Sequence, residues 1–81
     1  MTLEDLGRIL SDASRFYLNG EMSGPAYSRL VEALIVTSGF EEANPSLEEV
    51  ADSMASYTPG GVDGLFDDSG LRALAQRLVN D

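Results

Sequence analysis

The sequence contains no cysteine, no histidine, no lysine and no tryptophan. Without cysteine there is no disulfide and no thiolate nucleophile, and without histidine the commonest general base is missing. A zinc site would have to consist of carboxylates alone, which is an unfavourable ligand set for zinc. The chain therefore lacks the usual residues for acid–base, nucleophilic or zinc chemistry, and we expect no enzymatic activity, no cofactor and no metal.

Long apolar runs are also missing. No stretch approaches the about 18 to 20 apolar residues that span a bilayer. The chain opens with the acidic residues Glu4 and Asp5, whereas a secretory signal begins with basic residues followed by an apolar stretch. These features predict a cytoplasmic protein.

Basic residues are few, and this shortage is the most informative bulk property. Fourteen acidic side chains outweigh five basic ones, which gives a formal net charge of −9, and every basic residue is an arginine. Nucleic acids and anionic membranes are bound through basic surfaces, so we expect neither as a direct partner. An acidic protein attracts basic partners, although a high net charge also serves simply to keep a small protein in solution.

The 81 residues leave room for a single domain, residues 1–81. Four segments carry apolar residues three or four positions apart, a spacing typical of amphipathic helices. We predict helices at residues 3–18, 24–38, 45–57 and 68–79. Four short amphipathic helices can share one core only by packing together, so the sequence predicts an all-α, compact antiparallel four-helix bundle that is a monomer when free.

Local signals mark the ends of these helices. Thr2 with Asp5, and Ser23 with Pro25 in the first turn, are typical of helix starts. Gly39 suits the left-handed position that follows a helix. Asn44-Pro45 predicts the third start and Pro59-Gly60-Gly61 the third stop, while Asp67 or Asp68 is expected to cap the last helix.

We expect the apolar stripes of the four helices to form the core. They consist of Leu3, Leu6, Leu10, Ala13, Tyr17, Tyr27, Leu30, Val31, Leu34, Ile35, Leu47, Val50, Ala51, Met54, Tyr57, Leu71, Leu74, Ala75 and Leu78. Leu65 and Phe66 are expected to hold the far end of the last loop against this core. The hydroxyl of Tyr57 and the side chain of Val36, on the polar side of the second helix, are candidate contacts for a partner.

Two motifs in the chain resemble functional sites. The acids between Asp63 and Asp68 suggest a calcium loop, but leucines stand at ligand positions counted from either end, so the motif fails. Ser53 and Ser69 each follow an aspartate, as the modified serine of an acyl carrier protein does. Ser53 lies inside a helix and Ser69 is followed by glycine, so an ordinary surface serine is the favoured interpretation for both.

The acids are distributed unevenly. Between Arg29 and Arg72 there are nine acids and no base, whereas the first helix balances its charges. The nine are Glu32, Glu41, Glu42, Glu48, Glu49, Asp52, Asp63, Asp67 and Asp68. A surface of one sign repels itself, so it indicates a basic partner more readily than a role in folding.

The order of residues resembles a known family. The stretch from Phe16 to Leu30 resembles the run that joins the first two helices of the colicin D-type immunity proteins. Further along, the same family's pattern is followed in order by Pro45, Glu48-Glu49-Val50, Tyr57-Thr58-Pro59 and Phe66-Asp67-Asp68-Ser69-Gly70-Leu71. The resemblance implies an antiparallel four-helix bundle that inhibits a ribonuclease toxin, in colicin D-like members one acting on transfer RNA, by placing acidic side chains in its basic active site.

The family's partner-binding acids lie around the end of the third helix and the loop after it. At the matching positions this chain has Ala55, Ser56, Tyr57, Thr58, Gly60 and Gly61, with Asp63 as the acid. We therefore expect the partner contacts at Glu41, Glu42, Glu48, Glu49, Asp52, Asp63, Asp67 and Asp68. The alternatives are a carrier-like domain loaded on a serine and an acidic adaptor that sequesters a basic protein.

Overall fold

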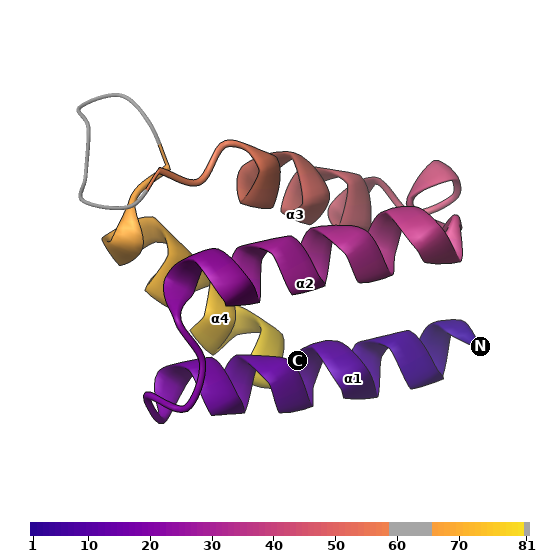
Figure 1. Ribbon diagram of the computed structural model, residues 1–81. Helices are drawn as coiled ribbons and strands as arrows, with labels where there is room; N and C mark the ends of the chain where they lie inside the picture. The colour runs from indigo at the N-terminus through magenta and orange to yellow at the C-terminus, as the bar shows by residue number, and fades with distance from the viewer. Residues whose placement is uncertain (59–65, 81) are drawn as a thin grey trace.

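The computed structural model describes residues 1–58 and 66–80 (Figure 1). Within these residues the chain forms four α-helices and one short 3-10 turn: α1 (Leu3–Leu18), α2 (Gly24–Ser38), η1 (Phe40–Glu42), α3 (Pro45–Ala55) and α4 (Asp68–Asn80). The predicted all-α fold is confirmed, and three of the four predicted helices agree with the observed bounds to within one residue. None of the helices in the described part of the chain combines the length and apolar character needed to cross a bilayer.

The helix starts are fixed by local hydrogen bonds. Thr2 and Asp5 form a capping box, in which the Asp5 N–H donates to Thr2 Oγ1 at 3.0 Å and the Thr2 N–H donates to Asp5 Oδ2 at 3.3 Å. At α2, Ser23 Oγ accepts the Ala26 N–H at 3.2 Å. Gly39 ends α2 with a φ of 75°, a left-handed conformation that glycine adopts without strain.

Helix α3 is two residues shorter than predicted. It ends at Ala55, because Thr58 leaves the helical path and its N–H donates to the Phe66 carbonyl at 2.8 Å. Its start at Pro45 is as predicted, and the Asn44 side chain donates to the Phe40 carbonyl at 2.8 Å. The early end therefore depends on a residue outside the helix itself.

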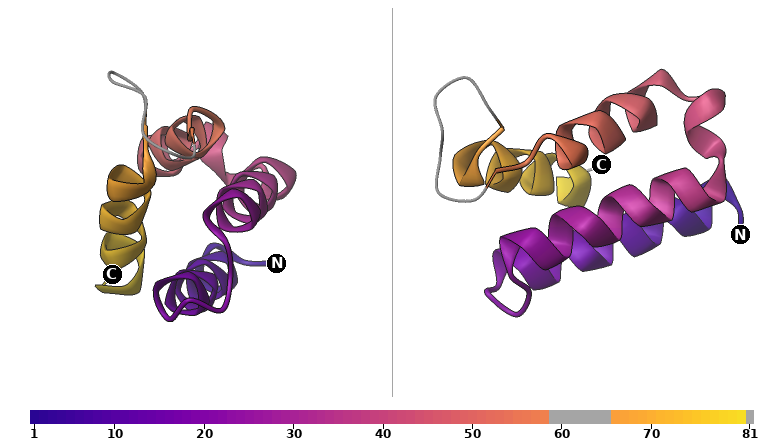
Figure 2. Two further views of the ribbon diagram at one scale, coloured as in Figure 1. Left: turned by 60° about the vertical axis from the view of Figure 1, so that its left-hand side comes forward. Right: turned by 45° about the horizontal axis from the view of Figure 1, so that its top comes forward.

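The four helices are arranged around a common core: α1, α2 and α3 run in alternating directions, and α4 lies across them (Figures 1 and 2). Helix α1 packs against α4 and α2, α2 packs against α3, and η1 packs against α3. The buried core comprises Leu6, Leu10, Ala13, Tyr27, Val31, Ile35, Val50, Ala51, Met54, Leu71, Leu74 and Ala75. All twelve belong to the apolar stripes predicted above, and Phe66 packs against this core as expected.

Two residues predicted for the core lie at the surface. Leu3, in the first turn of α1, is 46% exposed, and Leu30, on α2, is 37% exposed. Leu30 stands at the edge of its stripe, on the side of α2 where a groove remains open. Leu30 is therefore exposed because the groove leaves this side of α2 open.

A polar pair lies inside the core. Ser14 and Tyr27 are both fully buried, and their hydroxyl oxygens are 2.5 Å apart. Ser14 donates its single hydroxyl proton to the Leu10 carbonyl at 2.7 Å, so the Tyr27 hydroxyl is the donor to Ser14 Oγ. The Tyr27 ring also stacks on Tyr17 with centroids 4.6 Å apart. This pair and the stack join α1 to the first turn of α2.

Candidate protein-binding surface

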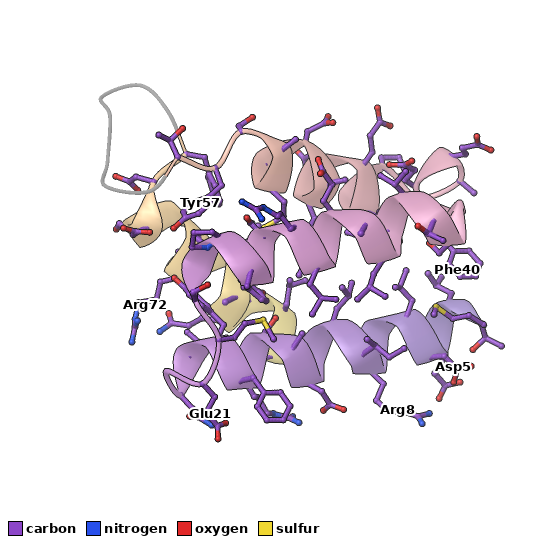
Figure 3. The ribbon with its side chains drawn as sticks, in the orientation of Figure 1. Asp5, Arg8, Glu21, Phe40, Tyr57 and Arg72 are labelled. Carbon is purple, nitrogen blue, oxygen red and sulfur yellow. The ribbon has the colours of Figure 1, made fainter. Side chains whose placement is uncertain are left out.

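The outer side of α3 is acidic. Glu48, Glu49 and Asp52 are all exposed, and the helical period places them away from the buried Val50 and Met54. Figure 3 shows side chains that end in oxygen projecting from the upper edge of the molecule, along α3. Because one helix carries all three carboxylates, their relative positions are fixed by its backbone.

Two further acids continue this surface at one end of the bundle. Glu41 and Glu42 lie in η1, which packs against α3. Glu42 is exposed and Glu41 is half-buried. We refer to Glu41, Glu42, Glu48, Glu49 and Asp52 together as the acidic face.

The acidic face has no cation paired with it. In the described residues, which include all five arginines, the ion pairs lie within α1. Arg8 is 3.7 Å from Asp5, and Arg15 is 3.2 Å from Asp12.

Asp67 and Asp68 lie apart from the acidic face, at the N-terminus of α4. Asp67 Oδ1 accepts the Gly70 N–H at 3.0 Å and so caps this helix, as expected. The Tyr57 hydroxyl donates a hydrogen bond to Asp68 Oδ1. These two acids thus make contacts that organise the fold, and the eighth predicted contact, Asp63, lies outside the described residues.

Tyr57 connects three elements at this end. A Cβ added to Gly24, the first residue of α2, would collide with the Tyr57 hydroxyl, so glycine permits this close approach. Burial, followed by the hydrogen bond and charge of Asp68, raises the pKa of Tyr57 to about 12. The hydroxyl that was considered for a partner contact is therefore used within the protein (Figure 3).

The two serines considered as carrier sites occupy different environments. Ser53 is half-buried on α3 and, with Glu49, borders a small pocket shared with Leu74 and Arg77 of α4. Ser69 is exposed in the first turn of α4. Neither belongs to the acidic face.

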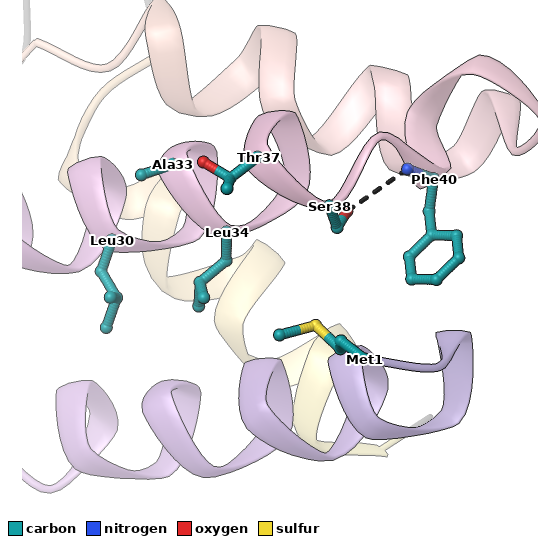
Figure 4. A pocket seen from close by; sticks show the side chains of 7 residues that line it. All are labelled: Met1, Leu30, Ala33, Leu34, Thr37, Ser38 and Phe40. Atoms are coloured by element: carbon teal, nitrogen blue, oxygen red, sulfur yellow. Dashed lines mark hydrogen bonds between the residues drawn. The ribbon is translucent and has the colours of Figure 1, made fainter.

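An apolar groove beside the acidic face was not predicted from the sequence. It has a volume of about 430 Å³ and is lined by Met1, Leu30, Ala33, Leu34, Thr37, Ser38 and Phe40 (Figure 4). The periodicity assigns Leu30 and Leu34 to the core, and of these Leu34 packs against the core while it also lines the groove. The signal available in the sequence is that Arg29 and Glu32 are the only charged residues of α2, too few for a helix with an ordinary solvent-facing side.

No three acidic side chains in residues 1–58 and 66–80 lie close enough together to hold a metal ion.

Comparison with protein-family models, with curated proteins and with solved structures finds no match. The function is therefore inferred from the surface of this chain and from the order of residues described above.

Proposed function

We propose that this protein is an immunity-type inhibitor, which binds a toxin nuclease domain and blocks its basic active site with the acidic face. The observation that supports this most strongly is the set of carboxylates on α3 and η1, which have no ion-pair partner in the described part of the chain. The resemblance of the residue order to the colicin D-type immunity proteins supports the same function.

The proposed mechanism is occlusion. A nuclease that cleaves RNA holds the phosphates in a cleft lined by arginine and lysine. Carboxylates on a rigid helix satisfy the same cations through charge-assisted hydrogen bonds, which are often bidentate with arginine. Because α3 is already folded and packed, little conformational entropy is lost when these side chains enter the cleft. The nuclease then has no room for its substrate.

Long-range electrostatic attraction increases the rate at which the two proteins associate in this mechanism. A net charge of −9 creates a negative potential that draws a basic domain towards the protein. Association is expected to be fast at low ionic strength and to slow as salt is added.

The test takes the purified product of the neighbouring gene, which the proposal expects to contain a ribonuclease domain, and measures inhibition with transfer RNA as the substrate. The variant Glu48→Lys/Glu49→Lys/Asp52→Lys should bind about 100-fold more weakly or worse, as is typical when desolvated charge pairs are reversed. The matched control is Glu4→Lys/Asp12→Lys/Glu21→Lys, which changes the net charge equally at exposed positions outside the acidic face.

The control distinguishes a specific surface from general attraction. If the acidic face enters the nuclease cleft, the control variant keeps most of its inhibition and loses mainly association rate. Equal inhibition by the two variants would show that the acidic face is not the contact surface. Absence of inhibition by the wild-type protein would remove the nuclease as the partner.

A further inference from the structure

The apolar groove is an open surface feature. It lies along α2, with Met1 on the side of α1 and Phe40 at the end nearest η1 (Figure 4). Met1 is 66% exposed and Leu30 is 37% exposed, although both are apolar. The hydroxyl of Ser38 donates to the Ile35 carbonyl at 2.7 Å and also accepts the Phe40 N–H at 3.3 Å. The polar atom of Ser38 is therefore satisfied within the protein.

The side of α2 that forms the groove carries no charge. Both charged residues of the helix, Arg29 and Glu32, lie on its other side, where they border α3 beside Met54 and Ala55. A surface helix usually presents charged residues to water opposite its buried stripe. An uncharged groove at this position is therefore typical of a surface that is covered by a partner.

Two acids that form no ion pair in the described residues follow the groove residue Phe40 directly in the chain. Phe40 lines one end of the groove, and the next two residues in η1 are Glu41 and Glu42. Val36, which is 53% exposed, lies on α2 between the groove and the α3 side of the helix. The apolar groove and the acidic face therefore meet at η1, where one three-residue turn contributes to both.

This combination of an apolar floor and an acidic border specifies the chemistry of the occupant. The complementary surface has apolar side chains in a row with basic side chains beside them. The groove follows α2 from Leu30 to Ser38, which is about 12 Å of helix. A short amphipathic helix, with anchors at positions i, i+4 and i+7, matches a groove of this form.

A second copy of this chain fits the groove less well. In a two-fold dimer the same surface meets itself, so Glu41 and Glu42 of one copy would face the equivalent region of the other. Two molecules that each carry a charge of −9 also repel each other. Charge complementarity thus favours a basic partner over self-association.

We propose that the groove between α2, Met1 and Phe40 is a second contact site for the basic protein partner, and that it receives the apolar side of a short basic amphipathic helix. This inference rests on the proposed function, because it assigns both surfaces to one partner. In it, the acidic face determines the association rate and its salt dependence, while the groove provides apolar burial that slows dissociation.

The first experiment uses the complete chain and a synthetic probe. The probe is a helical peptide with leucines at i, i+4 and i+7 and lysines on the opposite side, and binding is followed by amide NMR shifts. We expect shifts along the second half of α2 and at Met1 and Phe40. A control peptide with glutamate in place of lysine should bind at least tenfold more weakly, because the acids at the border repel it.

Two variants locate the binding. Leu30→Gln removes an apolar contact from the groove and should weaken the binding of the lysine peptide by about tenfold. Leu3→Gln is the matched control, since Leu3 is similarly exposed and does not line the groove; its affinity should equal that of the wild type. Both substitutions are at exposed positions, and circular dichroism confirms that each variant is folded.

Three outcomes overturn the inference. One is peptide shifts confined to α3, with Leu30→Gln binding as the wild type does. Another is a concentration-dependent dimer in sedimentation that Leu30→Gln abolishes, which would make a second copy the occupant. The third outcome comes from the nuclease domain: if the wild-type protein inhibits it and Leu30→Gln dissociates from it at the same rate as the wild type, the groove does not contact the nuclease.

Failure of the wild-type protein to inhibit the nuclease, with peptide binding intact, would instead reject the nuclease as the partner and retain the groove as a binding site.

Discussion

At the scale of single residues, the buried pair Ser14 and Tyr27 shows how the core tolerates polar groups. Each hydroxyl has a partner, because Tyr27 donates to Ser14 and Ser14 donates to Leu10. No buried side-chain nitrogen or oxygen in the described residues lacks a hydrogen bond. The cost of a substitution here depends on which hydroxyl is left without a partner.

We therefore expect Ser14→Ala to be more harmful than Tyr27→Phe. Ser14→Ala leaves the Tyr27 hydroxyl buried and unpaired, which costs about 1 to 3 kcal/mol of unfolding free energy. Tyr27→Phe removes the hydroxyl and leaves Ser14 bonded to the Leu10 carbonyl. The double variant should be more stable than Ser14→Ala alone. Urea unfolding of the four proteins measures the coupling, and additive effects would contradict the hydrogen-bond assignment.

Glycine substitutions provide a second test at this scale. Gly24→Ala should destabilise the fold by about 1 to 3 kcal/mol, because the new Cβ would overlap the Tyr57 hydroxyl. Adding Tyr57→Phe should recover part of this loss. Gly7→Ala is the control: Gly7 lies inside α1 with no atom near an added Cβ, so alanine should stabilise by about 0.5 to 1 kcal/mol. Thermal unfolding measures all four proteins, and equal effects at the two glycines would contradict this account.

The pKa of Tyr57 gives a prediction for high pH. Burial and Asp68 raise this pKa to about 12, above the ordinary value of 10.0, because the folded state favours the neutral phenol. The contribution of Tyr57 to stability is therefore complete below about pH 10 and is lost between pH 10 and 12. Tyr57→Phe should reduce the fall in unfolding free energy over this range. Burial also raises the pKa of Tyr17 and Tyr27, so part of the fall should remain.

At the scale of helices, short-range signals predicted most of the boundaries. Thr2, Ser23, Gly39 and Asp67 act within a few residues of their own helix ends, so the sequence alone was sufficient. The end of α3 differs from the prediction by two residues, because the Thr58 N–H bonds to the carbonyl of Phe66, eight positions later in the chain. A pattern that covers one helix contains no information about such a contact.

The same difference explains how far the candidate surface could be predicted. Glu48, Glu49 and Asp52 share one side of α3 because of the helical period alone. Whether Asp67 and Asp68 join them depends on where α4 lies, and the structure places these two at its capped N-terminus. The apolar groove depends on which side of α2 remains uncovered, and the spacing of apolar residues cannot distinguish that side from the core.

At the scale of the whole molecule, charge works against folding. The net charge is −9, and the acidic face forms no ion pair in the described part of the chain, so its carboxylates repel one another in the folded state. Added salt screens this repulsion, since the Debye length falls from about 30 Å at 0.01 M to 8 Å at 0.15 M. We therefore expect the unfolding free energy to rise as NaCl is added over this range.

The salt dependence should originate mainly in the acidic face. Glu48→Gln/Glu49→Gln/Asp52→Asn removes uncompensated charges and should flatten the rise in stability with salt. Asp12→Asn is the contrasting variant, because Asp12 lies 3.2 Å from Arg15 and its removal takes away an attraction that salt weakens. That variant should keep the rise or steepen it. Urea unfolding at stepped NaCl concentrations measures each slope. If the triple variant and Asp12→Asn give the same slope of unfolding free energy against NaCl concentration, the repulsion is spread over the whole surface. In that case α3 contributes no more than other regions to the negative potential that a basic partner meets.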